Sequence, residues 1–307
     1  MKMKLTDAIT TFLTSMIGIR SPNTILWYKQ RLPDLVSYLG DKAIKLITIH
    51  DLRQWRADLF SRQTRYINHP YHVIKPGGLS VYTIHQYIRS SKRLFKWLHQ
   101  EGLLDHNPAA RLELPKLPKQ KPRGIDPDLL KALINAVNNR PRDLAIIYLL
   151  ADTGCRIGGL CGLRIKHLDL DNCSAVVTEK GEITRPVFYL ECTAELIRSW
   201  LAIRPSCETD YLFIGYRKPH NPLMPSGVYD MLKITSYKLG IRSGFNPHNF
   251  RHAAIRGWLN SGMPLPDASR LAGHASVAIT GDIYGFVSDT QLKQDHHLHS
   301  WLNKLIS

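Results

Sequence analysis

The sequence predicts a mainly helical protein of two domains that carries one small antiparallel β-sheet. The chain has 307 residues, which exceeds the usual size of a single domain. Residues 113–124 hold three prolines and four basic residues with a single acid, a composition typical of an extended linker. Residues 174–190 combine β-branched runs with a central turn, whereas most other segments have helical periodicity.

The first domain, residues 1–112, is predicted to be helical. Ser21 is a typical N-cap residue, and Pro22 suits the first position of a helix. Apolar residues follow at helical spacing as far as Gly40, which predicts one helix over this stretch. A further helical segment, DLRQWRADLF, is predicted over residues 51–60.

A loop and a long helix complete this domain. Residues 62–78 contain two prolines and two glycines without a helical period, so we expect a loop that makes additional DNA or subunit contacts. Ser80 then caps a strong amphipathic helix that stops at Gly102. Four basic residues on its polar side are predicted to follow a phosphate backbone, with a merely solvated face as the alternative: Arg89, Lys92, Arg93 and Lys96.

The second domain, residues 125–287, is predicted to surround the hairpin with helices. The hairpin turns around Gly181, and a short strand, YLFI, is predicted over residues 211–214. Gly273 is predicted to end one helix, and Ser276 to cap the short helix that follows. The remaining helix signals are starts at Asp126, Thr193, Ser226 and Pro247, and stops at Gly154 and Gly262.

The charge is concentrated in the first part of the chain. The net charge is +16 and the pI is near 9.7, which suggests a polyanionic partner. Residues 1–123 hold 21 Lys and Arg against 8 Asp and Glu, whereas residues 124–307 hold 20 against 17. The first part is therefore suited to DNA phosphates, with a generically soluble basic surface as the alternative. Four linker residues are predicted to lie along DNA: Lys116, Lys119, Lys121 and Arg123.

Several classes of protein are disfavoured. No apolar run reaches the roughly 18 to 20 residues that span a bilayer, and Asp7 interrupts the start of the chain where a signal peptide needs an apolar core. The cysteines are odd in number and form no CxxC pair, so we expect neither a disulfide framework nor a zinc site, and a reducing cytosol as the compartment.

Candidate catalytic side chains lie at the edges of predicted elements. His248 and Arg251 are three positions apart near a helix start, so both project from one face at the positive end of the helix dipole, which suits an anion. A capping histidine and a surface arginine would give the same spacing. Four others occupy comparable places: Arg156 at a turn between helices, Lys180 in the hairpin, and His274 and Tyr284 in the last folded segment.

Two groups of possible metal ligands are weak, and we predict no metal site. The histidines of the tail lack a separated second ligand pair, so solvated or helix-end side chains are the preferred interpretation: His296, His297 and His299. Three aspartates form no obvious two-metal cluster, which disfavours a metal-dependent nuclease or transposase: Asp152, Asp169 and Asp171.

Five segments, in this order, resemble the catalytic signature of the tyrosine recombinases, the phage-integrase family: TGCRIGGLCGLR, EKGEITR, HNFRHAA, LAGHAS and DIYGFV. Residues 79–116 also resemble the end of that family's helical core-binding domain. The resemblance covers most of residues 5–290. It implies a SAM-like N-terminal domain and a catalytic domain that clamp DNA between them.

The resemblance also implies a role for each candidate side chain. Arg156 and Arg251 would grip the scissile phosphate, and Lys180 would protonate the leaving 5′ oxygen. His248 and His274 would donate hydrogen bonds, and Tyr284 would be the nucleophile that forms a 3′-phosphotyrosine, without ATP, metal or another cofactor. Guanidinium groups suit this reaction because they neutralise the nonbridging phosphate oxygens bidentately.

The implied partners are double-stranded DNA recombination sites and further copies of the chain, as a tetramer on two sites. Residues 288–307 carry an apolar stripe, which predicts a C-terminal helix for subunit contacts, with folding back on its own domain as the alternative. The expected location is the cytoplasm, at the nucleoid in a bacterium or archaeon, and a mobile element is a natural context. Cutting by Tyr284 in its own subunit is the arrangement we expect.

One departure and two other functions remain open at this point. The family usually has an acidic residue three positions after its first arginine, where this sequence has Gly159. That acid is generally interpreted as supporting the fold or the arginine, so its loss is expected to alter local geometry more than chemistry. The alternatives to a recombinase are a type IB topoisomerase, which shares the phosphotyrosine chemistry, and a catalytically silent DNA-binding regulator.

Overall fold

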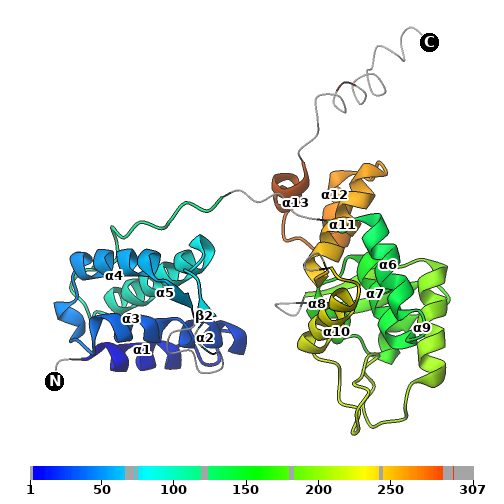
Figure 1. Ribbon diagram of the computed structural model, residues 1–307, viewed down its shortest axis with the longest axis horizontal. Helices are drawn as coiled ribbons and strands as arrows, with labels where there is room; N and C mark the ends of the chain where they lie inside the picture. Colours follow the sequence, from blue (N-terminus) through cyan, green and yellow to red (C-terminus); the bar gives the residue numbers. More distant parts are fainter. Residues whose placement is uncertain are drawn as a thin grey trace. The chain divides into compact units, whose positions relative to one another are not determined.

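The computed structural model describes residues 3–65, 73, 75–118, 124–179, 183–241, 245–285 and 293. The chain divides into two compact units, Met1–Lys119 and Gln120–Ser307, each with its own hydrophobic core (Figure 1). The predicted fold class, mainly helical with small antiparallel sheets, is confirmed. In the part of the chain that the structure describes, no helix is both long enough and apolar enough to cross a bilayer.

The described residues of the first unit form five α-helices around a core that includes Phe12, Leu35, Trp55 and Phe95. Its helices are α1 (Leu5–Thr14), α2 (Pro22–Lys29), α3 (Leu32–Leu39), α4 (Ile49–Ser61) and α5 (Val81–Gln100). The predicted caps at Ser21 and Ser80 are present, because each hydroxyl accepts a hydrogen bond from the backbone N–H three residues later. These caps fix where α2 and α5 begin.

The single helix predicted between Ser21 and Gly40 is wrong. The structure has two helices here, and α2 ends at Lys29 before α3 begins at Leu32. The cause is Pro33, which lacks a backbone N–H and whose ring would clash with the carbonyl of residue 29 in a continuous helix. The apolar spacing runs through the break because both helices face the same core.

The loop predicted over residues 62–78 contains a two-stranded ribbon. Strand β1 (Thr64–Arg65) pairs antiparallel with β2 (Lys75–Pro76), and Gly77 lies next to the ribbon in the left-handed region at φ 104°. Residues 66–72 and 74 lie outside the described residues. The proposed DNA or subunit contacts of this loop therefore stay a prediction.

Lys92 makes contacts that the sequence did not suggest. Its ammonium group donates to the carbonyl oxygens of Ala109, Ala110 and Leu112, at 3.0, 3.1 and 2.5 Å. All three of its N–H donors are thereby used inside the unit. Contact with a phosphate backbone stays a prediction for the other three residues of this face, of which Arg89 and Lys96 are exposed.

Lys92→Met is expected to destabilise the first unit by about 2 kcal/mol, because three carbonyl oxygens would lose a charged donor while the aliphatic packing stays. Denaturant unfolding of the full chain measures the loss, and faster amide hydrogen exchange in α5 assigns it to this unit. Lys96→Met is the matched control, since Lys96 is exposed on the same helix and its loss should change stability little. Equal stability of both variants would contradict this role.

In its described residues, the second unit packs eight α-helices around a three-stranded sheet. The helices are α6 (Pro127–Val137), α7 (Pro141–Thr153), α8 (Ile157–Cys161), α9 (Glu191–Ile203), α10 (Pro225–Lys238), α11 (Pro247–Asn260), α12 (Leu265–Ala272) and α13 (Val277–Tyr284). The antiparallel sheet has the order β3 (Leu168–Asp169), β4 (Ser174–Glu179), β5 (Ile183–Phe188). The predicted hairpin is β4 and β5, and its turn, residues 180–182, lies outside the described residues.

Three local predictions need correction. Residues 211–214 form isolated bridges at Tyr211 and Ile214, not a strand. Helix α9 begins at Glu191, and the hydroxyl of Thr193 donates to Asp152 instead of capping the helix. Ser276 has the extended backbone of an N-cap residue, but its side chain makes no capping hydrogen bond. Tyr211, Ile214 and Thr193 form contacts with residues outside their own segments in place of the expected local structure. Ser276 lacks the expected local hydrogen bond.

Candidate active site

Three arginines from different elements meet at the C-terminal end of α12. Arg185 of β5 donates to the carbonyl of Leu271 at 2.6 Å, Arg251 of α11 to that of Ala272 at 2.6 Å, and Arg156 to that of Gly273 at 3.2 Å. The last carbonyls of a helix have no partner within the helix and carry its negative partial charge. The end of α12 thus gathers three guanidinium groups in one place.

A glycine at the end of α7 makes room for two of them. Gly154 adopts the left-handed conformation at φ 56°, after which Arg156 takes the N-cap position of α8. The carbonyl of Gly154 also accepts a hydrogen bond from Arg251 at 2.8 Å. A Cβ at residue 154 would lie 3.2 Å from the Cβ of Ala254, so glycine suits both the backbone angle and the packing.

Arg251 is almost fully buried, with 6% of its surface exposed. Burial and the neighbouring charge of Arg156 lower its pKa to about 10, so it remains charged near neutral pH. Within the described residues Arg251 forms no ion pair, and it donates hydrogen bonds to the backbone carbonyls of Gly154 and Ala272. A buried cation beside other cations would be stabilised by an anion, which is what a phosphate supplies.

A buried carboxylate balances the other two arginines. Glu179, the last residue of β4, forms an ion pair with the Arg156 guanidinium, and one of its oxygens accepts the Arg156 backbone N–H at 2.8 Å. The same carboxylate pairs with Arg185 at 3.1 Å. Burial opposes its ionisation, but the Arg156 N–H and the charges of both arginines outweigh burial and lower the pKa of Glu179.

His274 follows the left-handed Gly273, which ends α12 as predicted. A Cβ at residue 273 would lie 2.4 Å from Nε of Arg185, so only glycine fits there. Nδ1 of His274 is 2.6 Å from the hydroxyl of buried Thr280. Burial and the charges of nearby arginines, Arg251 first, lower the pKa of His274 to about 4, so its ring is neutral and can present Nε2–H to an oxygen.

Tyr284 is the last residue of α13 and is half-buried. Its hydroxyl is hydrogen-bonded to Nδ1 of His252, and the two rings lie 5.7 Å apart between centroids. Burial raises the pKa of Tyr284, although the charges of Arg251 and Arg256 oppose this. Burial and nearby positive charges, that of His248 first, lower the pKa of His252, so its neutral ring suits proton acceptance.

The predicted side chains are thus only partly brought together. Arg156, Arg251 and His274 share the end of α12, and Tyr284 lies close enough to Arg251 for its charge to affect the phenol. His248 lies exposed on the first turn of α11, one turn before His252. Three predicted linker contacts, Lys119, Lys121 and Arg123, and the hairpin residue Lys180 lie outside the described residues; Lys116 is exposed.

Sequence comparison decides the family. Residues 123–291 match the model of the phage integrase family. The tyrosine recombinase XerC of Alcanivorax borkumensis is 31% identical over 285 residues, which cover 89% of this chain and 87% of the relative. XerC of Anoxybacillus flavithermus is 28% identical over 294 residues, 91% of this chain and 92% of the relative.

The chain belongs to the phage integrase family. It is accordingly a tyrosine recombinase, as the signature segments predicted, and neither the topoisomerase nor the silent regulator is favoured.

Solved structures support the same fold for this recombinase. The XerA recombinase is 26% identical with a TM-score of 0.52, over 96% of this chain and 98% of that one. The Tn1549 transposon integrase in complex with a circular intermediate DNA is 18% identical with a TM-score of 0.76, over 96% and 99%. A lambda integrase tetramer bound to a Holliday junction is 15% identical with a TM-score of 0.70, over 93% and 79%.

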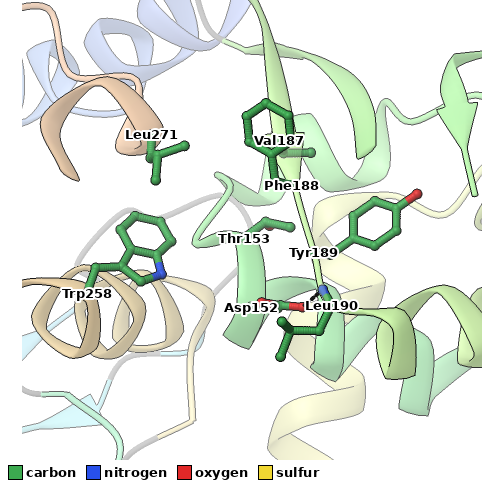
Figure 2. A pocket seen from close by; sticks show the side chains of 8 residues that line it. All are labelled: Asp152, Thr153, Val187, Phe188, Tyr189, Leu190, Trp258 and Leu271. Carbon is green, nitrogen blue, oxygen red and sulfur yellow. Dashed lines mark hydrogen bonds between the residues drawn. The ribbon is translucent and has the colours of Figure 1, made fainter. Parts of the chain in front are cut away.

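A pocket of about 220 Å³ lies beside the site, and Asp152 is one of the residues that line it. Figure 2 shows Trp258 and Leu271 facing the end of β5 and Leu190 across this pocket. The Asp152 carboxylate accepts the backbone N–H of Leu190 at 2.7 Å and the Thr193 hydroxyl at 2.8 Å, so it fastens the start of α9 to the end of α7. Among the described residues no three His, Cys, Asp or Glu side chains are grouped to hold a metal.

Sequence reasoning missed three side chains of the site: His252, Glu179 and Arg185. His252 is four residues after His248, so helical geometry places both on one face of α11. This spacing could have identified His252 as a site residue from the sequence. Glu179 follows Ala175 and Val177 at the two-residue spacing of the buried face of β4. A carboxylate on a buried strand face requires a cation, which Arg185 and Arg156 supply.

Proposed function

We propose that this recombinase cuts and rejoins double-stranded DNA through attack of the Tyr284 hydroxyl on a scissile phosphate. The observation that carries this proposal is that Arg156, Arg251 and His274 lie together at the end of one helix. The positive charge of Arg251 also acts on the phenol of Tyr284. These groups supply positive charge and hydrogen-bond donors for a phosphate, and a nucleophile beside it.

The reaction balances without an external energy source. The Tyr284 oxygen forms a bond to phosphorus, its proton passes to Nδ1 of His252, and the bond from phosphorus to the 5′ oxygen breaks. Lys180 gives its proton to that oxygen, as the resemblance to the family implies. The products are a 3′-phosphotyrosine and a free 5′ hydroxyl. Attack of a 5′ hydroxyl from another strand on the phosphotyrosine then restores the DNA and the phenol.

The two arginines act on the charge of the phosphate. Each guanidinium presents five N–H donors in a planar fork, and the contacts to backbone carbonyls leave donors available on both Arg156 and Arg251. These donors would neutralise the nonbridging oxygens as negative charge builds up in the pentavalent transition state. Their fixed positions mean that little reorganisation accompanies the reaction.

The charge distribution and the DNA-bound solved structures support a proposal for the wider assembly. The basic first unit and the linker would hold the DNA of a recombination site, through Arg89, Arg93, Lys96 and the linker residues. A tetramer on two sites is supported by the lambda integrase tetramer on a Holliday junction, and residues 288–307 would join its subunits. The recombinase would act at the nucleoid, with a mobile element as its context.

A nicked suicide substrate tests the proposal. Cleavage next to the nick releases a short fragment, so the covalent protein–DNA adduct accumulates and is resolved on a denaturing gel. A DNA fragment bound by the protein, identified by footprinting, supplies the site. Exchange of strands between two such sites is the expected second step. Relaxation of supercoiled plasmid without exchange would indicate a topoisomerase, and binding without any adduct would overturn the proposal.

His252 should set the acid limit of the reaction. Its neutral ring accepts the phenol proton, and its lowered pKa keeps the ring neutral until the pH falls below the ordinary histidine value of about 6.5. The rate of adduct formation should therefore be flat near neutrality and fall at lower pH. His252→Gln should remove this limb and slow the reaction about 100-fold, in a pH–rate profile. His106→Gln in the first unit is the control; an unchanged acid limb in His252→Gln would contradict the assignment.

A further inference from the structure

The side chain of Glu179 fills the space directly next to Gly159. Gly159 lies on the short helix α8, three residues after Arg156, and an added Cβ there would lie 3.2 Å from Cγ of Glu179 and 3.4 Å from Cβ of Val177. The Glu179 side chain thus fills the volume that a side chain on residue 159 would enter. Its side chain is 1% exposed, so water screens its ion pairs only weakly.

The contacts of Glu179 fix both ends of Arg156. One carboxylate oxygen accepts the backbone N–H of Arg156, and the other pairs with its guanidinium. A residue held at backbone and side chain has few rotamers left. The second guanidinium terminal nitrogen donates to the carbonyl of Gly273, so the fork is held in a single orientation.

The same carboxylate reduces repulsion within the arginine cluster. Arg185 donates to it through Nη2 at 3.1 Å, and Arg156 and Arg185 form no other ion pair in the described residues. Without Glu179, three guanidinium groups would share the end of α12 with no negative partner. Arg156 would then turn toward solvent, because 36% of its side chain is already exposed.

We propose that Glu179 is the positioning residue that holds Arg156 in its phosphate-binding orientation, and that Gly159 is the matching vacancy that admits this carboxylate from the hairpin. This inference rests on the proposed function, in which Arg156 contacts the scissile phosphate. The hairpin strand that carries Glu179 also leads directly into Lys180, so the carboxylate ties the start of the hairpin turn to the arginines. The negative charge that orients Arg156 therefore comes from β4 and not from the helix that Arg156 begins.

The test moves the carboxylate from one side of this space to the other. Four full-length proteins are compared on the suicide substrate: wild type, Glu179→Ala, Gly159→Glu, and the double variant Glu179→Ala with Gly159→Glu. Glu179→Ala should lower the rate of adduct formation at saturating protein about 100-fold, because a small misplacement of a catalytic group costs this much. Gly159→Glu should also be slow, since two carboxylates would compete for one space.

The double variant should recover at least tenfold over Glu179→Ala, since residue 159 then supplies the only carboxylate of this space. A purely structural role for Glu179 predicts no such recovery, because removing its side chain and adding another at residue 159 would each disturb packing. A wild-type rate in Glu179→Ala, or a double variant no faster than Glu179→Ala, would overturn the inference.

Further measurements and control variants keep the outcomes separate. Adduct formation by wild type and its loss in Tyr284→Phe test the proposed function independently of Glu179, so its failure is distinct from failure of this inference. Gel shifts under saturating conditions separate DNA binding from the rate of cleavage. If Glu179→Ala does not fold, near-isosteric Glu179→Gln takes its place and should slow cleavage in the same direction. Glu191→Ala, which removes an exposed ion pair with Arg198, is the matched control.

Discussion

Replacing Tyr284 with phenylalanine is expected to abolish the covalent protein–DNA adduct completely while DNA binding persists. In the proposed reaction the phenol oxygen bonds to phosphorus, and phenylalanine retains the ring packed beside His252. The Thr280 hydroxyl is not expected to take its place, since it is buried against His274. A denaturing gel with labelled suicide substrate measures the adduct, and a native gel shift measures binding.

The control for this variant is Tyr237→Phe. Tyr237 lies near the end of α10 and is 86% exposed, so loss of its hydroxyl should leave cleavage unchanged. Mass spectrometry of the wild-type adduct should identify the peptide that contains Tyr284. An adduct that persists in Tyr284→Phe, or a modified peptide elsewhere in the chain, would show that another residue is the nucleophile.

Arg251→Ala is expected to slow cleavage about 1,000-fold, the second-largest effect in the site. Arg251 is the most buried of the two arginines assigned to the phosphate, and water cannot replace its donors readily. Its loss also leaves the carbonyls of Gly154 and Ala272 without this donor, so some loss of stability is expected. Single-turnover cleavage at saturating protein measures the rate.

Arg251→Lys separates charge from geometry. Lysine keeps the positive charge but cannot span both carbonyls and a phosphate with a planar fork, so cleavage should remain well below wild type. Arg164→Lys is the control, because Arg164 pairs with Asp210 outside the arginine cluster. Thermal unfolding of each variant shows whether the fold is retained. A folded Arg251→Ala that cleaves at the wild-type rate would remove Arg251 from the mechanism.

The parts of the fold that were predicted correctly are those set by local chemistry. Caps at Ser21, Ser80 and Asp126 and the stop at Gly154 depend on residues close in sequence, and each is present. The break between α2 and α3 was missed because the apolar spacing continues across it. That spacing outweighed the signal of Pro33, whose ring would clash with the carbonyl of residue 29 in a continuous helix. Local signals thus gave most helices, and failed where two signals conflicted.

The candidate site was predictable only in part because its contacts join distant residues. The signature segments named Arg156, Arg251, His274 and Tyr284, but not the partners that orient them. His252 could have been inferred from helical spacing. The contacts of Lys92 could not, since backbone carbonyls as acceptors leave no trace in the sequence.

Backbone carbonyls are also the acceptors at the end of α12, and this affects which of its positions can vary in sequence. The three arginines are anchored to the backbone oxygens of Leu271, Ala272 and Gly273, which every residue type provides. Gly273 is restricted by its conformation and by the closeness of Arg185, and Ala272 by its complete burial. We therefore expect the exposed positions of α12, such as Asp267 and Arg270, to be free to diverge and to acquire new partners while the three arginines keep their backbone anchors.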